Sequence, residues 1–423
     1  MVSLKKGVLR ITNEGDDLAK HLFEFCFALN LVTIFALYDV AAVAPVAAMM
    51  MFAASLFIWV GRKKKTVVIP YNTAWYTVFI IYNALTAIWA SYVPAVFLGA
   101  IVKFLIILIT VTSIAIYVDG PEELERILTL FIFSILINCC LELSAVPTAS
   151  WFDGAMGTHF SNFNANEMGF LTECAEMMAF YKAYNKNNKK YYILFLFFMF
   201  FTILTSSRKA TAVALIAPVL IVMLTTRKKN KFLTLIIMLL AVVGVGYLIM
   251  TNEQLYHVIG QRFNSMLNYY SEDTIRSDGS LATRNYFIEI AKGLFAESPI
   301  LGKGMNTFAN IVDLEYGLFK AYAHNNYWQV LSELGIIGFI IYYSMYAFLV
   351  IKLAKNIIIN KSKISIIFLS FMVLLMLTEW GMVTVNSKTA QIIIAIAYTA
   401  TYAGEIDGRQ YKYIENNKNQ MEE

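Results

Sequence analysis

The stretch YYILFLFFMFFTILTSSRKATAVALIAPVLIVML, residues 191–224, places two apolar runs on either side of a short polar turn that contains Arg208. The runs cover 191–204 and 211–224, and each is long enough to cross most or all of a bilayer. We therefore expect Arg208 at a membrane face, between two packed helices. An arginine in such a place is costly and usually meets an anion, and its planar guanidinium group fits phosphate best.

Composition indicates a polytopic membrane protein built from helices. Of the 423 residues, 59% are hydrophobic and 15% are charged, whereas soluble domains are roughly 45–50% apolar and about 25% charged. The apolar runs follow one another so closely that no large soluble domain fits between them. We predict about twelve transmembrane helices, at residues 21–38, 41–60, 71–91, 94–118, 127–147, 166–184, 191–205, 210–225, 232–250, 324–351, 364–385 and 389–403.

The basic residues predict the orientation of the chain. Its net charge is +5, but Lys and Arg cluster in short loops, which argues against nucleic-acid binding. With a cytoplasmic N-terminus and twelve crossings, all of these loops lie on the cytoplasmic side, as the positive-inside rule requires. Both termini are then cytoplasmic. The clusters are 62–65, Lys186 with 189–190, 227–229 with Lys231, and Lys352, Lys355, Lys361 and Lys363.

Two further features complete the predicted organisation. Ala42-Val43-Ala44 lies just inside the second apolar run, so we interpret the N-terminal region as an uncleaved signal anchor. Residues 1–250 hold the first nine transmembrane helices. Residues 251–323 form an extracytoplasmic loop with an amphipathic helix, and residues 324–423 hold the last three helices and a cytoplasmic tail. A large outer loop over a bundle suggests a site at the membrane–exterior boundary.

Arg284 precedes the apolar face of the helix predicted in this loop. Phe287, Ile290, Ala291 and Leu294, with Phe295, recur at helical spacing. That spacing puts Arg284 in the first turn, where a cation opposes the helix dipole unless an anion lies beside it. The segment 298–304, SPILGKG, then ends the helix with turn-forming residues.

His324 opens the next apolar run, in the sequence HNNYWQ. Its imidazole exchanges a proton near neutral pH, which suits a general base. Asn326, Gln329 and Glu333 form a polar stripe on this helix, and such a stripe faces a water-filled cavity or another helix. The competing interpretation is an anchoring belt of polar and aromatic residues at the membrane interface.

Other polar positions leave two interpretations open. Arg208 and Lys209 are equally explained as interface cations that end a helix hairpin. The segment 157–167, GTHFSNFNANE, suits carbohydrate binding but is also an ordinary polar turn with an Asn cap. Charged residues inside or near apolar runs either pair with one another or line a cavity. They are Lys103, Glu142, Glu173, Glu176 and Glu379.

Neither a metal nor another cofactor is predicted. The four cysteines lie in apolar segments, where thiols behave as small hydrophobic groups. The four histidines show no spacing typical of metal ligands.

Three stretches together form a recognisable pattern: Ser207-Arg208 at a helix hairpin, Arg284 with the segment 299–304, and the segment 324–338, HNNYWQVLSELGIIG. With these the chain resembles the bacterial O-antigen polymerase (Wzy-type) and O-antigen ligase family. Asn164-Ala165-Asn166 occupies a place where relatives often have Asn-Pro-Asn. The likeness covers roughly 157–338 and the overall topology.

The resemblance implies an all-α polytopic membrane fold, similar to the metal-independent glycosyltransferase C class. It also implies a substrate, an oligosaccharide carried by undecaprenyl diphosphate at the outer face of the membrane. Arg208 and Arg284 would hold the diphosphate, and His324 would accept the proton of the attacking sugar hydroxyl. Lys209, Asn325, Asn326 and Asn166 are expected to contribute to substrate binding. In-line displacement would invert the anomeric centre, and a chain-length regulator is a possible partner.

Three other activities compete with a polymerase that builds capsule or O-antigen polysaccharide. A ligase would transfer the glycan to lipid A core or to protein. A flippase for the same lipid-linked sugar would show internal repeats and cations deep in its lumen. No repeat is visible, although Lys103 fits that class. Metal-dependent polyprenyl-phosphate glycosyltransferases usually carry an acidic pair in the first outer loop, where this chain offers only Asp39.

Overall fold

A computed structural model describes residues 14–34, 43–62, 69–90, 92, 97–152, 165–225, 231–265 and 279–422. Several positions discussed above lie outside the described residues. They are the basic residues at 63–65 and 227–229, the first residue of Ala42-Val43-Ala44, Asp39, and the segment 153–164 with His159 and Asn164.

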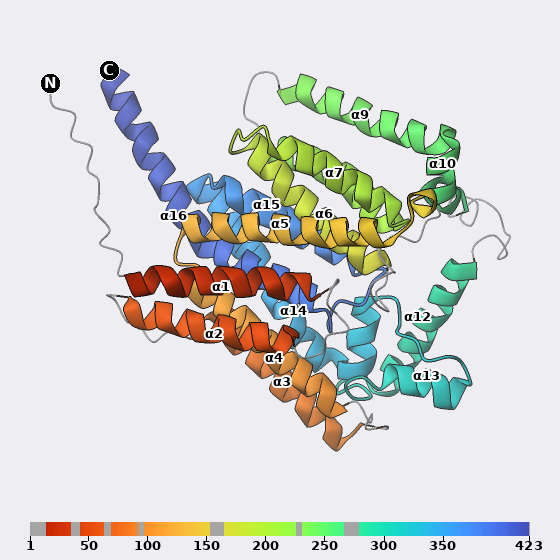
Figure 1. The fold of residues 1–423 in the computed structure, drawn as a ribbon. Coiled ribbons are helices and arrows are strands. Elements are labelled where there is room, and N and C mark those ends of the chain that lie inside the picture. Colours follow the sequence, from red (N-terminus) through yellow and green to blue (C-terminus); the bar gives the residue numbers. More distant parts are fainter. Residues whose placement is uncertain are drawn as a thin grey trace.

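Helices make up the fold, and the described residues contain no strand (Figure 1). Each of the twelve apolar runs overlaps a helix. The helices are α1 (Glu14–Val32), α2 (Val43–Gly61), α3 (Tyr71–Leu85), η1 (Thr86–Ile88), α4 (Phe97–Tyr117), α5 (Pro121–Ala145), η2 (Thr148–Ser150), α6 (Ala165–Tyr184), α7 (Tyr191–Leu204), α8 (Arg208–Thr225), α9 (Lys231–Thr251), α10 (Glu253–Leu255), η3 (Tyr256–Gly260), α12 (Gly279–Glu297), α13 (Phe308–Tyr316), α14 (Asn326–Asn360), α15 (Lys363–Thr378) and α16 (Lys388–Glu422).

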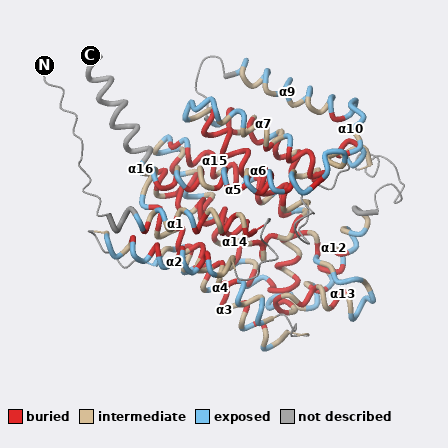
Figure 2. The backbone as a smooth tube through the Cα atoms, viewed as in Figure 1, coloured by how far each residue is buried: buried red, intermediate tan, exposed pale blue. Residues whose placement is uncertain are grey.

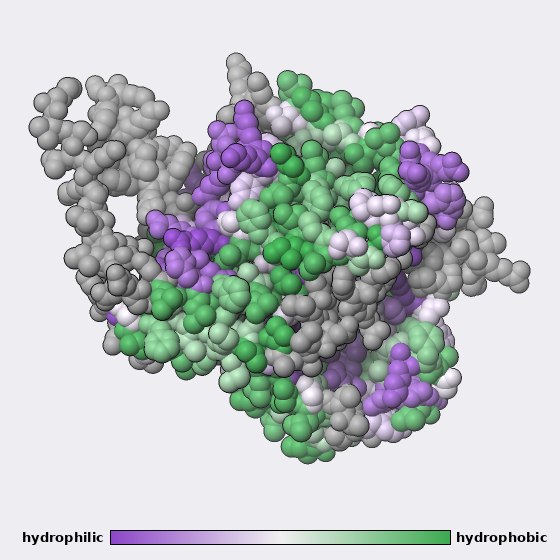
Figure 3. Space-filling model, viewed as in Figure 1, coloured by the Kyte–Doolittle hydropathy of each residue, from purple (hydrophilic) through white to green (hydrophobic). Residues whose placement is uncertain are grey.

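Five helices in the described part of the chain are long and apolar enough to cross a membrane: Val43–Gly61, Phe97–Tyr117, Pro121–Ala145, Phe232–Thr251 and Asn326–Asn360. In α9 only 6% of the residues in the apolar window are buried, and Figure 2 shows this helix exposed along its length. Hydrophilic residues gather towards two ends of the molecule, with hydrophobic residues between them (Figure 3). An exposed apolar belt of this kind requires lipid around it, so the all-helical membrane fold is confirmed, while the count of twelve crossings stays a prediction.

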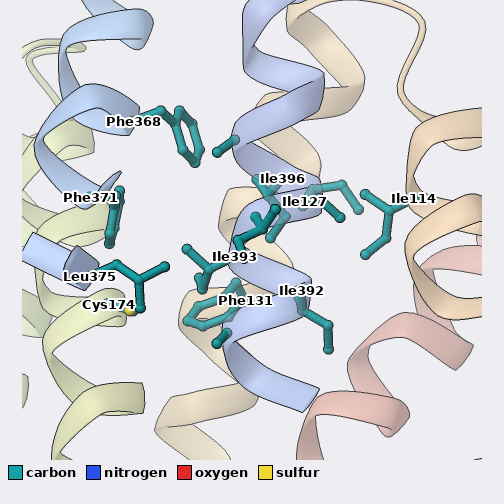
Figure 4. Close-up of a cluster of buried hydrophobic side chains, with 14 of the residues drawn as sticks. Ile114, Ile127, Phe131, Cys174, Phe368, Phe371, Leu375, Ile392, Ile393 and Ile396 are labelled. Atoms are coloured by element: carbon teal, nitrogen blue, oxygen red, sulfur yellow. The ribbon is translucent and has the colours of Figure 1, made fainter. Parts of the chain in front are cut away.

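The apolar core lies where α16 passes between α4, α5, α6 and α15 (Figure 4). Ile392, Ile393 and Ile396 of α16 are almost fully buried, and Phe131 of α5 is completely so. Because helices around them supply aromatic and branched side chains at helical spacing, the bundle excludes solvent over several turns. This core holds the ends of the surrounding helices in fixed relative positions.

The predicted amphipathic helix is α12. Its residues Phe287, Ile290, Ala291 and Leu294 are buried, and they pack against Phe308 and its neighbours in α13. Figure 1 shows α12 and α13 beside the first turns of α14, at the end of the bundle away from the C-terminal end of α16. This confirms the amphipathic face predicted from the sequence.

Two predicted details differ from the structure. The helix α12 begins at Gly279, so Arg284 is in its second turn and the argument from the helix dipole does not apply, since that effect falls off within the first turn. The run 364–385 is not one helix either. Its helix α15 ends at Thr378, because the carbonyl of the next residue, Glu379, accepts a hydrogen bond from the backbone N–H of Asn326 (2.8 Å).

The long helix α14 is interrupted at Gly335, whose φ of 64° and ψ of −170° are not helical. The segment 298–304 fills the break. The N–H groups of Lys303 and Gly304 donate to the carbonyls of Ser332 and Glu333 (2.9 and 2.8 Å), and the N–H of Ile336 donates to Pro299 (2.9 Å). The turn therefore replaces the hydrogen bonds that the interrupted helix loses. It fastens α12 to α14.

This join requires glycine at position 335. A Cβ atom added to Gly335 would lie 2.3 Å from the carbonyl oxygen of Ile300, and positive φ is strained for any other residue. We expect Gly335→Ala to lower the free energy of unfolding by at least about 2 kcal/mol, measured by thermal unfolding of the purified protein. Gly293→Ala is the matched control, because nothing lies within 4 Å of its added Cβ. Equal stability of the two variants would contradict the role given to this contact.

Candidate functional site

The hairpin between α7 and α8 is held by the segment that follows α9. Ser206 has a positive φ of 56°, which turns the chain between the two helices. Its hydroxyl donates to the carbonyl of Val258 (2.6 Å), and its own carbonyl accepts from Nη1 of Arg262 (3.2 Å). Nη1 of Arg208 donates in return to the carbonyl of Arg262 (2.9 Å). These reciprocal bonds fix the backbone from which Arg208 projects.

Asn166 lies at the same hairpin. Its Oδ1 accepts a hydrogen bond from the hydroxyl of Ser207 (2.9 Å), so the first turn of α6 contacts the residue just before Arg208. Close packing supports the contact. A Cβ atom on Gly169 would lie 2.7 Å from Cβ of Ala210, which means that α6 and α8 approach closely below the hairpin. The structure therefore brings together two parts of the predicted site that are separated by about forty residues.

Lys209 points towards the segment between α15 and α16. Its Nζ donates to the carbonyl of Gly381. The charges of Arg284, Glu173 and Arg208 all act on this ammonium group. Lys209 thus links the hairpin electrostatically to α12, α6 and the segment that precedes α16.

His324 lies two residues before the start of α14, in the left-handed region, with φ of 54°. Non-glycine residues are uncommon in this region, although His is enriched there, and the strain is sustained by bonds on both sides. The N–H of Ala323 donates to Oε1 of Gln329 (2.7 Å), and Oδ1 of Asn325 accepts from the N–H of Trp328 (3.1 Å). The imidazole lies 4.2 Å from the ring of Tyr322, centroid to centroid. Neither ring nitrogen is hydrogen-bonded to another described residue.

Burial, followed by the charges of Arg284 and Lys209, lowers the pKa of His324 to about 4 from its usual value of 6.5. The imidazole is therefore neutral near pH 7, the state in which it accepts a proton. Because their charges act on this pKa, Arg284 and Lys209 lie within electrostatic range of the ring. Groups from α8, α12 and the segment before α14 thus share one region.

Asn325 and Asn326 have partners within the protein. Nδ2 of Asn325 donates to the carbonyl of Trp380 (3.1 Å). Oδ1 of Asn326 accepts from the N–H groups of Thr384 and Val385 (2.9 Å each), and its Nδ2 donates to the hydroxyl of Tyr343 (2.9 Å). Both amides tie the start of α14 to the segment 379–387. This geometry supports a role in positioning His324, and their predicted contact with substrate stays a prediction.

A family model described as O-antigen ligase matches residues 193–343. Over these residues the chain is similar to the O-antigen ligase family. The matched stretch contains Arg208, Lys209, Arg284 and His324, and it ends within α14 beyond the break at Gly335. The search of the curated proteins found no match.

Sequence reasoning missed Arg262, and it did not identify the partners of Glu379. Arg262 holds the hairpin, but the acidic outer segment in which it lies offers no periodic pattern that would single it out. The carboxylate of Glu379 accepts from the hydroxyls of Tyr343 (3.0 Å), Tyr346 (2.5 Å) and Thr384. Its place inside an apolar run was a signal of a specific partner, although the spacing did not show which one.

The charge state of His324 gives a direct test of this arrangement. Because the charge of Arg284 is, after burial, a cause of the lowered pKa of His324, Arg284→Ala should raise that pKa from about 4 towards 6.5. The measurement is an NMR titration of the protein with nitrogen-labelled histidine, in which His324→Gln assigns the signal. Lys352→Ala, in the second half of α14, serves as the charge-matched control and should leave the titration unchanged. An unshifted midpoint in Arg284→Ala would place the guanidinium group away from the imidazole.

Proposed function

We propose that the protein is a polysaccharide polymerase of the membrane glycosyltransferase type. It transfers a growing glycan from undecaprenyl diphosphate to a lipid-linked repeat unit at the outer face of the bacterial inner membrane. The chain crosses that membrane twelve times with both termini in the cytoplasm. The family match supports a membrane glycosyltransferase acting on lipid-linked polysaccharide. The observation that carries the specific proposal is that Arg284 and Lys209 lie within electrostatic range of a neutral His324, while Arg208 acts on Lys209.

The proposed chemistry is a displacement at the anomeric carbon. An acceptor hydroxyl oxygen forms a bond to that carbon, the bond from the carbon to the diphosphate oxygen breaks, and the diphosphate leaves with the electron pair. The hydroxyl proton passes to a ring nitrogen of His324. Attack from the side opposite the leaving group inverts the anomeric centre. General-base help of this kind contributes typically about 10²–10⁴-fold.

Cationic groups stabilise the leaving group in this scheme. Negative charge builds on the diphosphate as the bond breaks, and guanidinium forks in a water-poor site bind it strongly without needing a metal. Binding of the diphosphate also offsets the charges of Arg284 and Lys209 that lower the pKa of His324. The imidazole consequently becomes a stronger base once the substrate is present.

The same chemistry supports a second candidate function. The matching family is described as O-antigen ligase, and a ligase would use the same donor site while transferring the glycan to lipid A core or to protein. A chain-length regulator is expected as a partner only for the polymerase. The two activities therefore differ in their acceptor rather than in the roles of Arg208, Arg284 and His324.

The polymerase proposal is tested with purified protein and lipid-linked repeat units. Wild type should yield a ladder of products, and Arg208→Ala, Arg284→Ala and His324→Ala should each reduce product at least about 10²-fold. Lys320→Ala is the control, because its side chain is 64% exposed outside the predicted spans. Product only after addition of lipid A core would indicate a ligase. Substrate that crosses the bilayer unchanged would indicate a flippase and remove the enzyme proposal.

A further inference from the structure

A second group of polar side chains lies at the ends of four other helices. Lys388 is the first residue of α16, Glu167 is in the first turn of α6, and Asn30 is two residues from the end of α1. Lys103 of α4 is six residues from that helix's start, which is about 9 Å at 1.5 Å per residue. All four residues are thus near the ends of their helices that join the predicted outer side of the bundle. None has a role in the proposed transfer.

Asn30 provides the clearest sign that something is missing there. Its side chain is 1% exposed, and neither Oδ1 nor Nδ2 has a hydrogen-bond partner among the described residues. Its backbone carbonyl accepts from Nζ of Lys388 (3.5 Å), so the unpaired amide belongs to the same cluster as the lysine. Buried amides are nearly always hydrogen-bonded, because an unmet donor or acceptor is costly. A ligand with acceptor oxygens would accept hydrogen bonds from Nδ2 of this amide and from the lysine.

The charges of the cluster do not balance. Lys103 and Lys388 lie within electrostatic range of each other, as do Lys103 and Glu167. Two ammonium groups therefore face one carboxylate. Like charges held together at the edge of an apolar bundle repel one another unless an anion lies between them.

The cluster is separate from the site around Arg208. Asn166 and Glu167 are consecutive residues of α6, and they turn to different neighbours. Asn166 contacts Ser207 at the hairpin, whereas Glu167 interacts with Lys103. The first turn of α6 consequently lies between the two groups of cations. The segment 381–388 connects them, since Gly381 binds Lys209 and Lys388 belongs to the second group.

We propose that Lys103, Lys388 and Asn30 form a second anion site, which binds the diphosphate of the acceptor lipid while the donor diphosphate occupies the site of Arg208 and Arg284. This inference rests on the proposed polymerase function, in which both substrates carry a diphosphate. Two such anions repel each other and require separate cations. The acceptor diphosphate does not leave, so no new charge develops on it. Lysines, which are compact point charges, suit it, whereas the leaving group is matched by arginine forks.

The test uses the full-length protein in nanodiscs of neutral lipid, titrated with farnesyl diphosphate as a soluble polyprenyl diphosphate. Wild type should bind two equivalents. Lys103→Ala with Lys388→Ala should retain one equivalent of unchanged affinity and weaken the other at least about tenfold. The double variant Arg208→Ala with Arg284→Ala should lose the equivalent that the lysine variant retains. Lys352→Ala with Lys355→Ala, which removes two exposed lysines of α14, should bind as wild type does.

Further variants separate binding from folding. Lys103→Arg with Lys388→Arg keeps the charges and should retain both equivalents. Asn30→Leu removes a buried unpaired amide, so thermal stability should stay the same or rise while the second equivalent weakens. A purely structural role for the cluster predicts that Asn30→Leu lowers thermal stability and leaves binding unchanged.

The outcomes distinguish this inference from the proposed function. Two retained equivalents in the lysine variant, or a single equivalent in wild type that depends on the arginines alone, would overturn the second site and leave the donor site standing. Two equivalents bound with unchanged affinity by the arginine variant would instead count against the proposed function. In a further arm, nanodiscs contain phosphatidylglycerol. If phosphatidylglycerol displaces the second equivalent of farnesyl diphosphate and resists displacement by it in turn, the site binds lipid headgroups and the acceptor assignment is wrong.

Discussion

The interruption of α14 at Gly335 is the feature on which the arrangement of the site depends. The turn between α12 and α13 replaces the backbone hydrogen bonds that the broken helix loses, and Tyr82 of α3 donates to the free carbonyl of Leu334 (2.7 Å). Glu333, which is 4% exposed, accepts from the N–H of Phe308 at the start of α13 (3.1 Å). One short stretch therefore fixes α3, α12 and α13 relative to α14. Since Arg284 is on α12 and His324 precedes α14, their separation is set by these backbone contacts.

Electrostatics explains why such rigidity is needed. Burial, followed by the charges of Arg284 and Arg208, lowers the pKa of Lys209 to about 7, so without an anion these basic groups oppose one another's charged forms. Surrounding groups hold them in place. Nζ of Lys209 donates to the carbonyl of Gly381, and Nη1 of Arg208 donates to the carbonyl of Arg262. The charge of Glu173 also acts on Lys209. A site whose cations are fixed before the substrate binds does not have to reorganise as charge develops in the transition state.

Much of this architecture was predictable from the sequence, and the reason is periodicity. The apolar runs, the amphipathic face of α12 and the hairpin before Arg208 follow from side-chain spacing and length, which act locally. Long-range backbone contacts leave no such pattern. Nothing in the spacing indicates that Pro299 meets Ile336, or that Arg262 binds the hairpin. The helix α12 also begins earlier than its apolar face, so the position of Arg284 within it was misjudged. The left-handed conformation of His324 likewise depends on hydrogen bonds made by the side chains of Gln329 and Asn325. Only the fold defines the partners of those bonds.

The low pKa of His324 is caused first by burial and then by the charges of Arg284 and Lys209. Together they keep the imidazole neutral but weakly basic. Under the proposed function, a diphosphate bound to the same cations would offset part of that effect, so the base would gain strength only when a donor is in place. If His324 were instead paired with a carboxylate, it would be protonated in part near pH 7 and unable to accept the hydroxyl proton. Cationic neighbours are therefore compatible with a general base here, because the substrate itself supplies the compensating charge.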